Sequence, residues 1–129
     1  MRHRNNKLLK LNTGSKKKTV FIRSLLSSLV AYNKVTTTPK RAKVLKAEAD
    51  SLFSKLVQLY DAYENEKDAQ RECVRVIKST IYGEEAGKKL LNELLPKFRS
   101  SKKTSGFVAD YKVWFRVGDW SLKVLVTIV

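Results

Sequence analysis

The last quarter of the chain alternates apolar and polar residues on both sides of a candidate turn at Gly118-Asp119. Such alternation is typical of two antiparallel strands with one buried face, because successive side chains of a strand point to opposite sides. A two-residue turn at this position would fix the register of the hairpin. The predicted cross-strand pairs are Val117 with Trp120, Phe115 with Leu122, Val113 with Val124 and Tyr111 with Val126.

This register gives the hairpin an apolar and a polar face. The apolar face holds the paired residues and is extended by Phe107, Ala109 and Ile128. The polar face holds Asp110, Lys112, Trp114, Arg116, Ser121, Lys123 and Thr127. An apolar face needs a cover, so we expect helices to pack on it. Trp114 lies beside three cations, which suits either base stacking or packing against a neighbouring element.

The rest of the sequence predicts the helices that would pack on the hairpin. Apolar residues three and four apart predict a helix from Ser15, as its N-cap, to a stop at Asn33. Two apolar stripes are expected on it, made of Phe21, Leu25 and Leu29 and of Ile22, Leu26 and Val30. A short extended connector over 35–37 leads to Thr38-Pro39, a strong helix start, and the second helix is predicted to reach about Tyr60.

The remaining helices are predicted to be shorter. Residues 61–68 are polar and are expected to form a loop or a frayed helix. A third helix is predicted over 69–79, with Cys73 facing inward, and a fourth from 84 or 85 to Leu95, ending before Pro96. We therefore predict an α/β (α+β) fold, with helices packed on a small sheet that includes the C-terminal antiparallel hairpin. A basic arm, extended in conformation, is expected over 1–14, and a single α+β domain over 15–129.

Charge is distributed very unevenly along the sequence. Met1–Lys46 holds thirteen Lys or Arg residues and no Asp or Glu, so +13 of the formal net charge of +15 lies in the first third. Crowding like charges costs self-repulsion, and folding does not require it. A basic arm that releases counterions from a phosphate backbone gives this arrangement a physical reason. The charge distribution thus predicts a nucleic acid as the partner.

Three regions carry the candidate RNA contacts. The first is the N-terminal arm, the second comprises the two helix starts, where cations lie beside free backbone N–H groups, and the third is the C-terminal part. The candidate residues are Arg2, His3, Arg4, Lys7, Lys10, Asn12, Lys16, Lys17, Lys18, Arg23, Thr37, Thr38, Lys40, Arg41, Lys43, Lys102, Lys103, Lys112 and Arg116.

The same charge distribution is compatible with three alternatives. The arm could be a solvated tail, and an Arg-containing start without acids superficially suits an organelle transit peptide. The two helix starts also suit a DNA-binding protein of the nucleoid or transcription type, although the second helix turns acidic or neutral after Lys46. Duplex DNA preferred over structured RNA would indicate that last alternative.

The sequence favours a protein that is not an enzyme. It contains no Gly-rich phosphate loop and no Cys-His set, and its single His lies in the arm. With one His and one Cys, neither a metal site nor another cofactor is predicted, and Cys73 is expected to be a small buried hydrophobe. No run of about eighteen apolar residues predicts a membrane span, no small-molecule substrate is expected, and the expected location is the cytoplasm.

Several segments, in order, resemble one family. They are Met1-Arg2-His3-Arg4, Lys10-Leu11-Asn12, Phe21 with Arg23 and Leu29-Val30, Thr37-Thr38 with Ala42-Lys43 and Leu45, and Gly106-Phe107, Lys112 and Arg116-Val117-Gly118-Asp119 before Val129. Together they resemble the bacterial large-subunit ribosomal protein numbered seventeen, over about 1–56 and 98–129. The family usually has Arg at the positions of Ala109 and Val117, and often has Arg and His at those of Thr13 and Lys17.

The resemblance implies a function and a location. A member of this family is expected to be a structural, rRNA-binding constituent of the large ribosomal subunit in the cytoplasm. Its expected partners are large-subunit ribosomal RNA and neighbouring large-subunit proteins near the peptide exit region.

Overall fold

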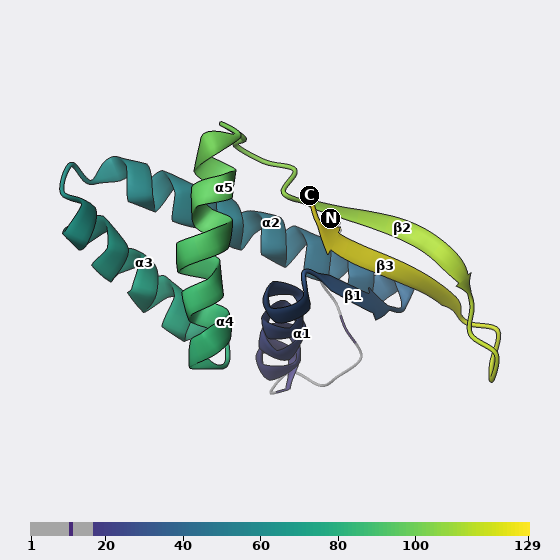
Figure 1. The fold of residues 1–129 in the computed structure, drawn as a ribbon. Helices are drawn as coiled ribbons and strands as arrows, with labels where there is room; N and C mark the ends of the chain where they lie inside the picture. Colours follow the sequence, from purple (N-terminus) through teal and green to yellow (C-terminus); the bar gives the residue numbers. More distant parts are fainter. Residues whose placement is uncertain (1–10, 12–16) are drawn as a thin grey trace, which may run out of the picture.

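The structure is a computed structural model that describes residue 11 and residues 17–129. Helices pack against one side of a small antiparallel sheet, as predicted from the sequence (Figure 1). In chain order the elements are α1 (Lys18–Tyr32), β1 (Lys34–Thr37), α2 (Pro39–Ala62), α3 (Glu66–Thr80), α4 (Glu84–Lys89), the π-helix η2 (Leu90–Leu94), α5 (Leu95–Ser100), β2 (Val108–Phe115) and β3 (Leu122–Ile128).

Helix α1 buries one apolar stripe, made of Ile22, Leu26, Leu29 and Val30. The adjoining stripe predicted from Phe21 and Leu25 is only half-buried. The helix ends where Asn33 adopts a left-handed conformation, with φ of 61°, which Asn tolerates better than most residues. The predicted stop is therefore confirmed. The predicted N-cap, Ser15, was wrong, because the helix begins at Lys18 and Lys17 takes the N-cap position.

Helix α2 is the longest element that the structure describes, and one side of it forms a large part of the hydrophobic core. It starts after Thr38 with Pro39 at its first position, as predicted, and buries Ala42, Leu45, Ala49, Leu52, Phe53 and Leu56. Thr38 takes the N-cap position, but its side chain makes no capping hydrogen bond, contrary to expectation.

The predicted connector after α1 is the strand β1, which lies antiparallel to β3. The sheet order is β1-β3-β2, so segments almost ninety residues apart pair directly, with Thr36 opposite Leu125 and Thr37 opposite Val124. This pairing brings the start of α2 beside the start of β3.

The predicted register of the hairpin holds only next to the turn. Phe115 lies opposite Leu122 as predicted, but a β-bulge between Lys112 and Trp114 shifts the rest by one residue. Lys112 rather than Val113 faces Val124, and Asp110 rather than Tyr111 faces Val126. A bulge adds an unpaired residue to one strand, so every side chain beyond it changes face.

The turn is also wider than predicted. Arg116 and Ser121 close it, because the Arg116 N–H donates to the Ser121 carbonyl at 2.7 Å and the Trp120 N–H donates to the Arg116 carbonyl at 2.8 Å. Val117 and Trp120 therefore belong to the loop and do not form a cross-strand pair.

Helical cover reaches only part of the sheet. Val124, Val126 and Val108 are buried, yet every residue of β2 from Asp110 onwards is exposed. The expectation that helices pack on the hairpin is therefore confirmed only away from the turn, because the hairpin extends past the helices (Figure 1). Where the contact between α2 and the hairpin ends, an ion pair takes the place of apolar packing: Lys46 of α2 donates to the Asp110 carboxylate at 2.8 Å.

The region predicted as a loop or a frayed helix over 61–68 contains a loop of only three residues, Tyr63, Glu64 and Asn65, between two helix ends. Helix α2 continues through Ala62, and α3 begins at Glu66 after Asn65, whose side chain accepts a hydrogen bond from the Lys67 N–H. Polar residues dominate here because both helix ends are exposed, so polarity alone was a poor guide to a loop. Cys73 is buried as predicted, and Ile77 is buried on the same helix.

The helix predicted to end before Pro96 continues to Ser100 without a break. Pro96 has no N–H and would clash with the carbonyl four residues earlier in a regular α-helix. The π-helical segment η2 relieves this conflict, because the wider turn lets the Leu95 N–H donate to the Leu90 carbonyl.

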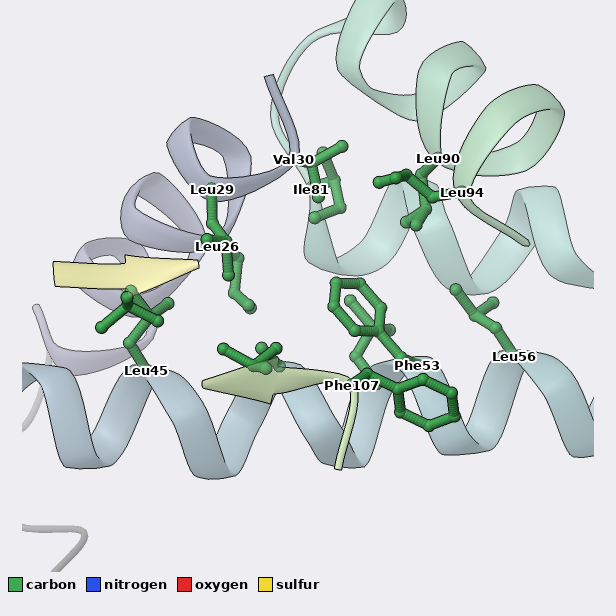
Figure 2. Packing of buried hydrophobic residues seen from close by; sticks show 14 of the residues in the cluster. Leu26, Leu29, Val30, Leu45, Phe53, Leu56, Ile81, Leu90, Leu94 and Phe107 are labelled. Carbon is green, nitrogen blue, oxygen red and sulfur yellow. The ribbon is translucent and has the colours of Figure 1, made fainter. Parts of the chain in front are cut away.

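Three rings from distant segments meet in the core. Phe98 of α5 lies between Phe53 and Phe107, with ring centroids 4.9 Å and 4.8 Å away. Figure 2 shows Phe53 and Phe107 close together at α2, below Ile81, Leu90 and Leu94. Leu11, the described residue nearest the N-terminus, packs half-buried against the same cluster. No helix among the described residues is long and apolar enough to cross a membrane.

Candidate nucleic-acid interface

The structure describes twelve of the predicted RNA-binding residues. The other seven, which are Arg2, His3, Arg4, Lys7, Lys10, Asn12 and Lys16, lie outside the described residues. Lys17 and Lys18 are at the start of α1, and Arg23 follows one turn later. Lys102 and Lys103 are in the link between α5 and β2, and Lys112 and Arg116 are on the hairpin.

One hollow brings several of these residues together. It has a volume of about 250 Å³ and lies where β1 leads into α2, next to the base of the hairpin turn. It combines three cationic side chains with hydroxyl groups, a donor set suited to phosphate oxygens. The residues that line it are Thr36, Thr37, Thr38, Arg41, Arg116, Ser121, Leu122 and Lys123. We call it the Thr-Arg hollow.

The pairing of β1 with β3 builds this hollow. It places Thr37 opposite Val124, so the end of β1 lies beside Lys123. The chain then turns directly into α2, and its first turn contains no acidic residue. The positive end of the α2 dipole and the free backbone N–H groups of the first turn therefore face the same space as the cations.

Arg41 is exposed and held in place by an aromatic ring. Its guanidinium lies 4.7 Å from the centroid of the Phe21 ring, which α1 supplies. Such stacking orients the guanidinium without neutralising its charge. No ion pair among the described residues involves Arg41, Lys40, Lys43 or Lys123. These cations thus keep their full charge for a partner.

Arg116 differs because it has an acidic neighbour. Its guanidinium donates two hydrogen bonds to the Asp119 carboxylate, one of them at 2.9 Å from Nε. These bonds lower the pKa of Asp119 to about 2, helped by the Ser121 N–H, and Asp119 raises the pKa of Arg116. The pair fixes the shape of the turn and reduces the net charge that Arg116 brings to the hollow.

Arg23 makes contacts within the protein. Its guanidinium lies 4.1 Å from the centroid of the Tyr82 ring and donates to the Lys78 carbonyl at 3.3 Å. Its Nε is buried without a hydrogen-bond partner among the described residues. Arg23 thereby connects α1 to the link between α3 and α4, and its predicted RNA contact stays a prediction.

Sequence reasoning missed Thr36, Ser121 and Lys123 as lining residues. The sequence marks Lys123 only as a neighbour of Trp114, and nothing local marks the two hydroxyl residues. Their common position depends on a strand pair between distant segments. The predicted residues that the hollow does unite are Thr37, Thr38, Arg41 and Arg116.

Comparison with known proteins agrees with the resemblance noted in the sequence. A family model described as ribosomal protein L17 matches residues 21–129. The chain belongs to the ribosomal protein L17 family. The match spans most of α1, the Thr-Arg hollow and the whole hairpin, so the middle of the chain, where the sequence resemblance was weakest, is included.

Curated relatives extend the similarity to the N-terminus. One from Thermodesulfovibrio yellowstonii is 32% identical over 131 residues, covering all of this chain and 87% of the relative. Another from Sulfurimonas denitrificans is 27% identical over 129 residues and covers both chains fully. Both are named large ribosomal subunit protein bL17. The basic arm therefore lies within the similarity to these L17 proteins, although outside the match to the family model.

Proposed function

We propose that this L17 family member is a structural, non-catalytic constituent of the large ribosomal subunit of the cytoplasmic ribosome and that it binds ribosomal RNA. The family supports the first part, because its curated members are named for that subunit. The Thr-Arg hollow is the observation that supports the second part, because it gathers cations and hydroxyl groups at a helix start with no unpaired acid among them.

The mechanism is phosphate neutralisation by a shaped surface. Arg41 and Lys123 supply charge, and the Thr37 and Thr38 hydroxyls and the first-turn N–H groups of α2 supply directed hydrogen bonds. RNA duplexes hide base edges in a deep groove, so contacts of this kind recognise backbone shape. The hollow therefore positions a bent or looped backbone.

The other predicted cations extend this surface. Lys40 and Lys43 are exposed on the first turns of α2, and Lys17 is exposed at the start of α1. The arm, with Arg2, His3, Arg4, Lys7, Lys10, Asn12 and Lys16, is proposed to thread between RNA helices. Lys18 and Lys112 are proposed to add contacts, and Lys102 and Lys103 to add a separate one, because Lys103 lies at the other end of β3, beside Ile128 and Val129. The neighbours proposed from the family resemblance are large-subunit proteins near the peptide exit region.

Salt dependence of binding to a large-subunit rRNA fragment tests the proposal. About six neutralised phosphates give a slope of log K against log salt of roughly −4 to −5. Arg41→Ala and Lys123→Ala should each make the slope shallower by roughly 0.7 to 0.9, because each removes about one phosphate contact. Removing residues 1–12 should reduce it further.

Lys67→Ala is the matched control, since Lys67 is an exposed cation on α3, away from the hollow (Figure 1). It should leave the slope unchanged. Slopes that stay the same in Arg41→Ala, Lys123→Ala and the arm deletion would contradict the proposal. Tighter binding to duplex DNA than to structured RNA at equal salt would favour the DNA-binding alternative instead.

A further inference from the structure

The hairpin carries a cluster of exposed aromatic and aliphatic side chains. Trp114 is 68% exposed, Trp120 is 72% exposed and Val117 is 91% exposed, and Tyr111, Val113 and Phe115 are exposed beside them. Single exposed apolar residues are common on protein surfaces, but a cluster on one protruding element marks a binding surface. Figure 1 shows that the hairpin projects beyond the helices, so none of the described helices covers this cluster.

The aromatic rings form a connected group rather than separate side chains. Phe115 lies between the two tryptophans, with centroids 5.9 Å from Trp114 and 6.1 Å from Trp120. Trp120 has φ of 55°, a conformation that bulky residues rarely adopt. The Trp120 N–H bond to the Arg116 carbonyl holds the turn in this form. The fold thus fixes wide aromatic faces in contact with solvent.

The charges around the rings favour an anionic partner. Lys123 lies directly opposite Trp114 across the strands, on the same face of the sheet, and Lys112 precedes the bulge. Both acids of the hairpin are already paired, Asp110 with Lys46 and Asp119 with Arg116. Aromatic faces beside cations without free acids are the combination that binds single-stranded nucleic acid.

The cluster also adjoins the proposed phosphate site. Lys123 and Leu122 line the Thr-Arg hollow, and they lie opposite Trp114 and Phe115 respectively. A backbone held in the hollow would present its next unpaired bases to these rings. We propose that the hairpin stacks unpaired RNA bases on Trp114 and Trp120, an inference that rests on the proposed rRNA binding.

Intrinsic fluorescence gives a selective test, because the only two tryptophans of the sequence are both in this hairpin. The full chain is titrated with an RNA stem that carries an unpaired loop and with a fully paired RNA of equal length. Stacking predicts that the looped RNA quenches the emission strongly and the paired RNA weakly. Trp114→Ala and Trp120→Ala should each weaken binding to the looped RNA by about 5- to 150-fold.

Matched variants separate stacking from loss of structure. Tyr32→Ala removes a comparably exposed aromatic side chain from α1, 74% exposed, and should leave the affinity unchanged. Trp114→Phe keeps a ring and should retain most of the affinity. None of the Trp variants should change the salt slope, because they remove no phosphate contact.

The outcomes distinguish this inference from the proposed function. RNA binding with the expected slope, but with unquenched emission and unaltered affinity in both Trp→Ala variants, overturns the stacking and leaves the rRNA proposal standing. Absence of salt-dependent RNA binding overturns both. A concentration-dependent dimer without RNA that disappears in the Trp→Ala variants would assign the hairpin to a second copy of the chain, and this result also overturns the stacking.

Discussion

Asp50 connects α2 to the beginning of β2, and its removal should destabilise the fold substantially. Its Oδ1 atom accepts hydrogen bonds from the N–H groups of Phe107, at 2.9 Å, and Val108, at 3.1 Å. Phe107 and Val108 are buried, so both N–H groups would lose their partner in Asp50→Ala. A hydrogen bond to a charged group contributes roughly 1.5 to 3 kcal/mol, and Asp50 is itself only half-buried.

We therefore expect Asp50→Ala to lower the free energy of unfolding by about 2 to 4 kcal/mol, which corresponds to a fall in Tm of roughly 6 to 16 °C. Asp50→Asn keeps one acceptor oxygen and should cost about 1 kcal/mol. Urea denaturation followed by circular dichroism measures both, and hydrogen exchange at Phe107 and Val108 reports the local opening.

The matched control is the other end of the same helix. Asp61 pairs with Arg99 at 3.0 Å, and both side chains are well exposed, so Asp61→Ala should change the free energy of unfolding by less than about 0.5 kcal/mol. Equal effects of Asp50→Ala and Asp61→Ala, or a change below about 0.5 kcal/mol for Asp50→Ala, would refute the proposed connection.

Three further predictions concern other parts of the fold. Gly83 has φ of 88° before α4, so Gly83→Ala should lower the free energy of unfolding by about 1 to 3 kcal/mol in a denaturant titration, although no atom crowds the site. Burial raises the pKa of the Cys73 thiol, so its alkylation at pH 8 should be far slower in the native protein than in urea, and equal rates would contradict its burial. Arg116 lowers the pKa of Asp119 to about 2, so the stabilisation of the turn by this pair should be present above about pH 4 and lost as pH falls through about 2, which tryptophan emission can follow. Asp119→Asn should abolish that acid transition.

Helix-start residues and apolar periodicity predicted a helix correctly where both lie in the same segment of the chain. Thr38-Pro39 and the apolar period of α2 are features of one continuous segment, and the helix begins there as predicted and buries an apolar stripe. The prediction of a loop or a frayed helix over 61–68 was correct only for residues 63–65, because exposed helix ends are as polar as loops. The prediction of a helix end before Pro96 was wrong because the π-helical turn that accommodates this residue has no simple sequence pattern.

Features that depend on contacts between distant segments could not be predicted from the sequence in this way. The apolar alternation predicted the Phe115–Leu122 pair beside the turn but not the bulge, because Val113 is compatible with either face. Asp110 pairs with Lys46 of α2, a contact between residues 64 positions apart that no local pattern marks. The Thr-Arg hollow depends on β1 pairing with β3, so sequence reasoning could find its cations but not their common position.

The most direct test is a high-resolution cryo-electron microscopy map of the large ribosomal subunit that contains this protein. We predict an RNA phosphate in the Thr-Arg hollow, within hydrogen-bonding distance of Arg41 and Lys123, and RNA along the basic N-terminal residues. A map in which the hollow and the arm face water or another polypeptide, with no nucleotide nearby, would contradict the proposed rRNA binding.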